Sequence, residues 1–173
     1  MEKNGFVPVG KIVGPHGVKG NIKVYSYAES LSVFKPGSLI LLINPKGLEK
    51  SYKIKWVKPH GKLALLALQG IENRNSVQAL IGSVFVVERS HFSEPEDGSY
   101  YWFDIIGISV FTTRNEYLGV VESIIPTGSN DVFVVKDPIK VHDNETLIPA
   151  IESVILEIDL KCKIIRVDLP EGL

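Results

Sequence analysis

One segment decides how this 173-residue chain divides: His91-Phe92-Ser93-Glu94-Pro95-Glu96-Asp97-Gly98-Ser99. It contains one large apolar residue, one proline, one glycine and three acidic residues, so few of its side chains can join a hydrophobic core. Such a composition is typical of a linker between domains. We therefore predict a first domain over residues 1–90, a short linker over residues 91–99 and a second domain over residues 100–173.

The formal charge changes sign at the same segment. Residues 1–90 carry thirteen basic and five acidic residues, a charge of +8, whereas residues 91–173 carry six basic and fifteen acidic residues, a charge of −9. A basic half suits phosphate groups and an acidic half suits a basic protein. Two solvated surfaces that attract each other account for the asymmetry equally well.

Composition also excludes several classes of protein. The single cysteine, Cys162, rules out an internal disulfide framework and a zinc site with several cysteines. No run approaches the ~18 apolar residues that a membrane-spanning helix needs, and residues 1–10 lack a signal-peptide pattern. We expect a cytoplasmic protein without membrane contact, and a monomer, because both domains look self-contained.

Residues 1–90 alternate between apolar and polar side chains, as a β-strand with one buried face does. The clearest run is Tyr52–Trp56, in which Lys53 and Lys55 occupy the polar face. One helix is predicted before Gly82, a residue suited to a helix C-terminus, because four apolar residues recur there at helical spacing: Ile71, Val77, Leu80 and Ile81. Short strands with one helix in about 90 residues predict a small β-barrel.

Residues 100–173 show almost only the strand pattern. Alternation is strong over Val154–Leu160 and Ile165–Leu169, and Gly119 is a candidate bulge inside a strand over Tyr117–Ile125. Closing such strands into a barrel removes exposed edges. The predicted fold class is therefore all-β, with two small β-barrel domains joined by a short linker.

No residue pattern indicates catalysis. The chain lacks the usual serine-hydrolase, zinc-protease and nucleotide-loop motifs. His16 and His60 lie in two Pro-His-Gly triplets, but nothing in their spacing requires a shared metal. Cys162 lies between Lys161 and Lys163, which would point to the opposite face of a strand, so a small core residue is predicted. We predict no catalytic residue, no cofactor and no metal.

The lysines of the first half carry more information. Residues 13–20 contain three glycines and one lysine, which favours a tight hairpin connection over a phosphate-binding nest, because no helix follows. Residues 1–70 hold eleven lysines and no arginine, and lysine is a point charge suited to RNA backbone rather than to base reading. Five lysines on predicted strands or turns are candidate contacts to an RNA backbone: Lys11, Lys19, Lys23, Lys53 and Lys55. An ordinary solubilising surface is the alternative for each of them.

An aromatic run, Tyr100-Tyr101-Trp102-Phe103, opens the second domain and is followed by Asp104. In an extended chain, successive side chains point to opposite faces, so one barrel core accepts only two of the four. Exposed Tyr and Trp are typical interface anchors, and nearby acidic residues suit a cationic partner. A seam between the two domains explains the run equally well.

At these residues the sequence resembles the RimM family of bacterial ribosome maturation factors over essentially its whole length. The resemblance rests on the order and spacing of several motifs: Val9-Gly10-Lys11-Ile12, His16-Gly17-Val18-Lys19-Gly20, Tyr100-Tyr101-Trp102 with Asp104, Ile106 and Gly107, Gly128-Ser129-Asn130-Asp131-Val132, Leu147-Ile148-Pro149-Ala150 and Leu169-Pro170-Glu171-Gly172-Leu173. It implies an N-terminal six-stranded barrel like those of translation elongation factors. It also implies a C-terminal PRC-type barrel similar to one in the photosynthetic reaction-centre H subunit.

The resemblance implies a function without catalysis. Members of the family assist assembly of the head of the 30S subunit by binding the nineteenth small-subunit ribosomal protein, and they promote maturation of the 16S rRNA. The family's paired tyrosines, associated with ribosome binding, match Tyr100 and Tyr101, to which we add Trp102 and Asp104 as partner-binding candidates. Three rivals remain: a general RNA-binding module, an enzyme that uses Cys162 or the histidines, and a partner-binding protein without RNA contact.

Overall fold

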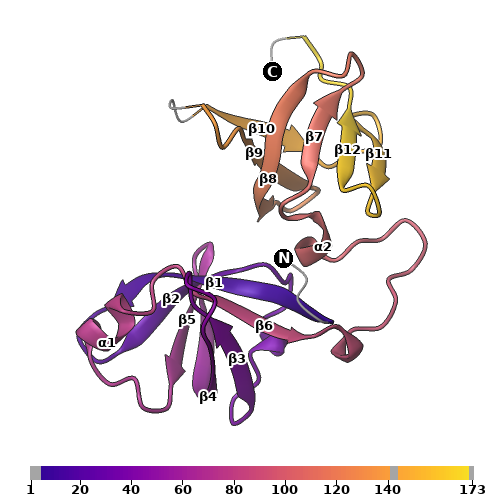
Figure 1. Ribbon diagram of the computed structural model, residues 1–173. Coiled ribbons are helices and arrows are strands. Elements are labelled where there is room, and N and C mark those ends of the chain that lie inside the picture. Colours follow the sequence, from indigo (N-terminus) through magenta and orange to yellow (C-terminus); the bar gives the residue numbers. More distant parts are fainter. Residues whose placement is uncertain (1–4, 141–143, 172–173) are drawn as a thin grey trace. The chain divides into compact units, whose positions relative to one another are not determined.

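A computed structural model describes residues 5–140 and 144–171. The chain divides into two compact units, residues 1–99 and 100–173, and each is built mainly from β-strands (Figure 1). A separate linker over residues 91–99 stays a prediction. Gly172 and Leu173, which end the closing motif, lie outside the described residues. Within those residues no helix has the length and apolar character needed to cross a membrane.

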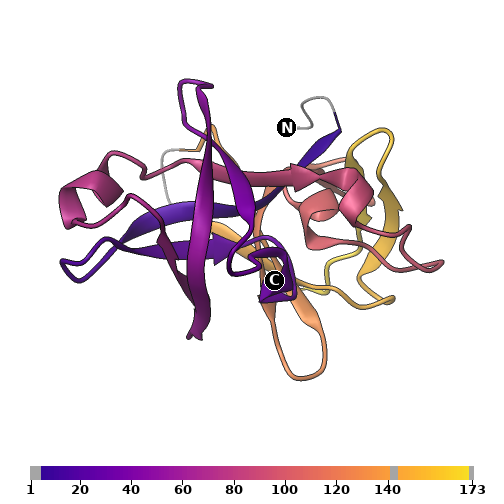
Figure 2. The ribbon, with the colours of Figure 1, turned by 90° about the horizontal axis from the view of Figure 1, so that it is seen from below.

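The first unit is a closed six-stranded barrel, which confirms the predicted fold class for this half. Its strands follow each other around the barrel in the order β1-β2-β5-β4-β3-β6, and all neighbours are antiparallel. Figure 2 shows the same strands from below, in indigo to magenta. The bounds are β1 Phe6–His16, β2 Asn21–Ser26, β3 Leu39–Ile43, β4 Glu49–His60, β5 Leu63–Leu68 and β6 Val84–Glu88.

Period-two alternation fills the interior of this barrel. The inward residues of β2, Ile22 and Val24, are fully buried, and the ring of Phe34 meets that of Phe85 with centroids 5.7 Å apart. Strand β5 is buried along most of its length, which matches its continuous apolar sequence. Two short 3-10 turns, η1 (Leu31–Val33) and η2 (Arg89–His91), complete the unit.

The helix predicted before Gly82 exists but is shorter than its apolar spacing suggested. Helix α1 spans only Arg74–Gln78, and the side chain of Asn73 caps it by accepting from the Ser76 N–H. Only Val77 of this helix is buried. The C-cap is Ala79, so the prediction that Gly82 ends the helix is wrong; the Gly82 N–H instead donates to the Ile12 carbonyl just before β6.

The second unit is a six-stranded sheet in the order β10-β9-β8-β7-β12-β11, preceded by the short helix α2 (Trp102–Ile105). The pair β7–β12 is parallel and the other neighbours are antiparallel. Among the described residues β10 and β11 are the edge strands of this sheet. The alternation of apolar and polar residues predicted strands but not which of them lie at the edges. The bounds are β7 Ser109–Thr112, β8 Tyr117–Pro126, β9 Asp131–Lys136, β10 Glu145–Pro149, β11 Ile155–Asp159 and β12 Ile164–Val167.

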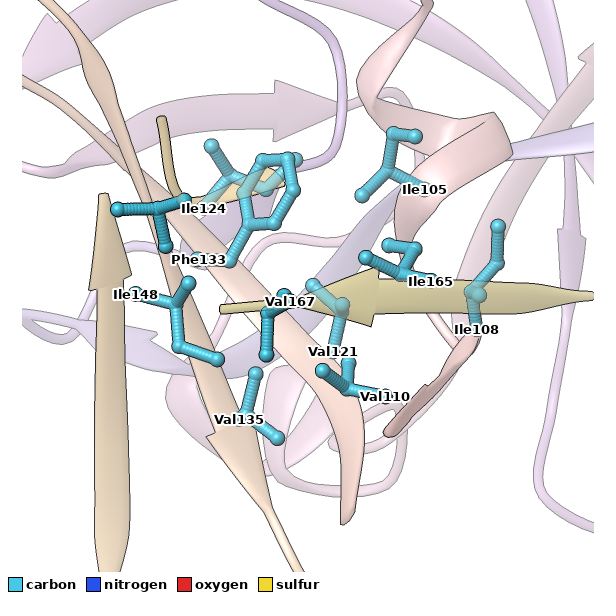
Figure 3. Packing of buried hydrophobic residues seen from close by; sticks show 11 residues of the cluster. Ile105, Ile108, Val110, Val121, Ile124, Phe133, Val135, Ile148, Ile165 and Val167 are labelled. Atoms are coloured by element: carbon cyan, nitrogen blue, oxygen red, sulfur yellow. The ribbon is translucent and has the colours of Figure 1, made fainter. Parts of the chain in front are cut away.

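The sheet of the second unit curves around one apolar core. Figure 3 shows Ile105 of α2 reaching toward the same cluster as side chains from the strands. Ile108, Ile124, Ile148 and Ile165 are all at most 2% exposed within it. Since α2 contributes Ile105 to this core, the residues that begin α2 are held in place by the packing of the whole unit.

Gly119 in β8 packs closely against the neighbouring strand β9. Its φ is +137°, and a Cβ atom at this position would overlap the carbonyl group of Lys136 in β9. The pairing of β7 with β8 also shifts register here, which confirms the bulge predicted at this glycine. Only glycine combines this backbone conformation with so close a neighbour.

Replacing Gly119 by alanine therefore tests the packing of the second unit. We expect Gly119→Ala to lower its free energy of unfolding by about 3 kcal/mol, because the new methyl group meets backbone in an unfavourable conformation. Scanning calorimetry of the whole chain measures this as a lower transition temperature of one unit. Gly128→Ala is the matched control, since nothing lies within 4 Å of its Cβ position. Equal transitions for the two variants would contradict this explanation.

Candidate functional site

The aromatic run that opens the second unit is extended only at its start. Trp102 and Phe103 belong to α2, so the extended conformation considered for the run does not hold beyond Tyr101. The Tyr101 carbonyl accepts from the Asp104 N–H at 3.0 Å, and the rings of Tyr101 and Phe103 stack with centroids 4.9 Å apart. Tyr100 is 41% exposed. The run therefore presents one exposed and two half-buried aromatic side chains.

As a partner-binding candidate, Asp104 is expected to be exposed like the acidic residues near it, but the structure buries its side chain. It is only 5% exposed, as part of the buried stretch Phe103–Ile105. The chain forms helix α2 at this point. In a helical turn the side chain of Asp104 no longer follows the alternation between two faces that an extended chain would give it. The Asp104 side chain is therefore not exposed for contact with a partner.

A hydrogen bond ties this aromatic run to a second motif. The indole Nε1 of Trp102 donates to Oδ2 of Asp131 at 2.9 Å, and both side chains are half-buried. The main-chain carbonyl of Asp131 accepts in turn from the N–H of Ala150 at 2.8 Å. Three motifs that are far apart in sequence, beginning at Tyr100, Gly128 and Leu147, thus meet at one residue, Asp131.

Asp131 is a residue that the sequence analysis missed as a site residue. Its place at the start of β9, directly after a polar turn, was the available signal, but no local pattern pairs it with Trp102, 29 positions away. The turn itself is held by Thr127, whose hydroxyl donates to the Asn130 carbonyl and accepts from the Asn130 N–H. Asp131 is therefore held by β9 and by this turn at once.

In the first unit, the candidate lysines lie on two neighbouring hairpins. Lys11, Lys19 and Lys23 belong to the β1–β2 hairpin, and Lys53 and Lys55 belong to β4. The hairpins β1–β2 and β4–β5 adjoin because β2 pairs with β5. All five side chains are exposed except that of Lys23, which is half-buried. The five lysines thus lie within a run of four consecutive strands of the barrel, β1-β2-β5-β4, and the β1–β2 turn.

Lys58 belongs with these lysines and was missed. A register shift between Ile54 and Trp56 interrupts the alternation of β4, so Lys58 pairs with Leu65 of β5. Lys23 pairs with the same Leu65 from the other side. Lys23 and Lys58 therefore flank one residue, and the bulge that causes this leaves no clear mark in the sequence.

The two Pro-His-Gly triplets meet in space. The imidazole centroids of His16 and His60 lie 5.1 Å apart in an edge-on arrangement. Among the residues that the structure describes, no third histidine, cysteine or carboxylate joins them to form a candidate metal site. His16 and His60 are the last residues of β1 and β4, so the pair brings the ends of these two strands together.

Cys162 is exposed, so the prediction of a core residue is wrong. Strand β11 ends at Asp159, and Cys162 lies in the turn that follows instead of on a strand. Oδ1 of Asp159 accepts from the main-chain N–H groups of Lys161 and Cys162, which fixes this turn. Asp159 also raises the pKa of the Cys162 thiol by hydrogen bonding to it and by its negative charge.

A closed basic barrel and an acidic unit that displays tyrosines define a two-domain binding protein. Residues 7–92 match the family model of the RimM N-terminal domain, and residues 102–173 match that of the RimM PRC barrel domain. The chain therefore belongs to the RimM family. This family is non-catalytic, which confirms the prediction that the chain is not an enzyme. The match also confirms the PRC-type barrel as the fold of the second unit.

Curated relatives match nearly the whole chain. The chain is 38% identical over 169 residues to the ribosome maturation factor RimM of Ligilactobacillus salivarius, covering 97% of this chain and 98% of the relative. It is 36% identical over 168 residues to that of Geobacter metallireducens, covering 97% and 95%. A crystal structure of a 16S ribosomal RNA processing protein RimM from Pseudomonas aeruginosa is 30% identical, covers 97% and 99%, and has a TM-score of 0.47.

A double-mutant cycle tests the bond between Trp102 and Asp131. We expect Trp102→Phe and Asp131→Ala each to destabilise the second unit, and the two together to cost about 1 kcal/mol less than their sum, because either change removes the same hydrogen bond. Urea unfolding followed by circular dichroism gives the three free energies. Additive effects would show that the bond contributes nothing measurable.

Thiol alkylation tests the link between Asp159 and Cys162. Because Asp159 raises the thiol pKa, less thiolate is present near pH 8 and the cysteine reacts slowly. We expect Asp159→Asn to lower the pKa and speed alkylation at pH 8, while the rate at high pH, where both thiols are ionised, changes little. Glu116→Gln, at an exposed acid outside this turn, is the control. An unchanged pH profile in Asp159→Asn would contradict the assignment.

Proposed function

We propose that this chain is a ribosome maturation factor that binds the immature 30S subunit and promotes maturation of its 16S rRNA. Both of its domains match RimM models, and curated relatives that it matches along nearly their entire length carry the name ribosome maturation factor. Assembly by binding needs no acid, base or nucleotide. The predicted cytoplasmic location and monomeric state belong to this proposal.

The protein partner in this proposal is the nineteenth small-subunit ribosomal protein. The exposed ring of Tyr100 and the half-buried rings of Tyr101 and Trp102 supply rigid aromatic area, as interface anchors usually do. The second half of the chain carries the −9 charge, which favours a basic partner. Asp104, being buried, serves this site by its place in α2.

The RNA contact in this proposal falls on the first unit. Lys11, Lys19, Lys23, Lys53 and Lys55 lie on adjoining hairpins of the barrel. Lysine without arginine favours contact with phosphate rather than the reading of base edges. This half would therefore lie against 16S rRNA backbone near the protein partner.

Release follows from a difference in affinity. A factor that binds the immature arrangement more tightly than the mature one shifts the population toward assembly and then leaves. Equal affinity for mature and immature subunits would contradict this account. The structure supports one rival function: lysines on consecutive strands of the barrel also suit a general RNA-binding module, which would bind bare RNA without needing the protein partner.

Calorimetry with the purified nineteenth small-subunit ribosomal protein tests the proposal. We expect the wild type to bind, and Tyr100→Ala/Tyr101→Ala to lose about 2 kcal/mol or more of binding free energy, because aromatic anchors dominate such interfaces. Measurements at two salt concentrations separate the charge contribution from the aromatic contribution.

Tyr117→Ala is the matched control for this experiment. Tyr117 lies on β8 of the same unit and is 38% exposed, close to the exposure of Tyr100. We expect this variant to bind like the wild type. Binding that survives in the double variant would move the site away from the aromatic run, and absence of binding at both salt concentrations would favour the RNA-binding module.

A further inference from the structure

Charge is segregated within the first unit itself. Residues 5–28 and 50–71 contain no acidic residue; they cover the β1–β2 hairpin and all of the β4–β5 hairpin except Glu49, the first residue of β4. They contain eight lysines: Lys11, Lys19, Lys23, Lys50, Lys53, Lys55, Lys58 and Lys62. Because β2 pairs with β5, these four strands form one continuous wall of the barrel. We call this wall, β1-β2-β5-β4, the basic wall.

Strand register places cations in rows on the outside of the basic wall. Lys23 and Lys58 flank Leu65, and Lys11 pairs with Tyr25. Leu65 faces the outside with Lys23 and Lys58, yet it is only 3% exposed, so neighbouring side chains cover it. Strands two apart in a sheet are about 10 Å from each other, which places Lys23 and Lys58 within reach of nearby phosphates of one strand.

Aromatic rings lie between these cations. The Nζ atom of Lys58 lies 5.0 Å from the centroid of the Trp56 ring, and the imidazoles of His16 and His60 pair at 5.1 Å. Tyr25 packs near Tyr27 with centroids 5.7 Å apart. Proteins that bind single-stranded nucleic acid combine this same alternation of cations for phosphates with rings on which bases stack.

The turn at one end of the basic wall is held rigidly. Nη1 of Arg74 donates to the carbonyl of Gly17 at 3.2 Å, and Gly20 packs so closely on residues 71–73 that a Cβ atom would overlap the Ile71 carbonyl. Helix α1 lies beside the β1–β2 hairpin in both views of the ribbon (Figures 1 and 2). Lys19 is therefore presented on a fixed turn, which limits the ordering cost of binding.

We propose that the basic wall binds single-stranded RNA, with Lys11, Lys23 and Lys58 on phosphates and Trp56 stacking on an unpaired base. This inference rests on the proposed function and deepens it, because it names the class of RNA and adds Trp56 and Lys58 to the contact. Duplex RNA is recognised mostly through phosphates and 2′-hydroxyls across its minor groove and leaves no base free to stack. Unpaired segments are the form in which immature rRNA offers both chemistries.

Fluorescence anisotropy with a labelled oligouridylate of about 12 nucleotides tests the class of ligand, since that length covers one small-barrel site. We expect the wild type to bind this strand more tightly than a duplex RNA with the same number of nucleotides per strand. Lys23→Ala/Lys58→Ala should reduce the slope of log affinity against log salt by about 1.4, because each lost phosphate contact removes ~0.7.

Lys35→Ala/Lys46→Ala is the matched control, because both lysines are exposed in loops that flank β3 and lie outside the basic wall. We expect its salt slope to equal that of the wild type. If both double variants lose the same slope, or if duplex RNA binds as tightly as the single strand, the proposal is wrong.

Trp56 gives a second readout that does not depend on charge. In a Trp102→Phe variant Trp56 is the only tryptophan, so quenching of its fluorescence on addition of oligouridylate reports base stacking. Trp56→Ala should weaken binding about tenfold. Unquenched fluorescence at saturating RNA would overturn the stacking contact. Neither readout involves the protein partner. A negative result here would contradict this inference, whereas the proposed function is tested by the calorimetry with the ribosomal protein.

Discussion

The pairing of β2 with β5 is the constraint on which the first unit depends. It joins two hairpins that are separate in sequence and closes the barrel, with Ile22 opposite Leu66 and Val24 opposite Ala64 on the buried side. Because side chains alternate with a period of two, the same register sets Lys23 outside against Leu65. A slip of one residue would bury the lysine and expose the core, so apolar packing fixes the position of the charge.

Much of the fold could be predicted because it rests on local patterns. Alternation around Ile22 and Ile54 indicated strands, and Gly119 indicated a bulge, since each depends on neighbours within a few positions. Contacts between distant residues could not be predicted in this way. The meeting of His16 with His60, and the flanking of Leu65 by two lysines, follow from strand order and from a bulge in β4.

The candidate site of the second unit shows the same division. The aromatic run was visible in the sequence, but its conformation was not. Ile105 packs in the apolar core, and the residues before it form helix α2. Asp104 is buried and Cys162 exposed for a related reason: each was placed by assuming a continuous strand where the chain turns. Asp131 then holds Trp102, so the surface near Tyr100 depends on the packing of three motifs.

Two units of opposite charge on one chain have a consequence for assembly. In the proposed function, a lysine-rich surface without arginine would contribute modest, salt-sensitive affinity for RNA, and a small aromatic patch would contribute modest affinity for a protein. Linked on one chain, the second contact forms at a high effective concentration, so the pair can bind about 10²–10⁴ times more tightly than either alone. If maturation pairs the RNA strand that the basic wall holds, one contact is lost and most of that gain disappears. The factor then leaves without a nucleotide, because folding of the RNA itself removes the binding site.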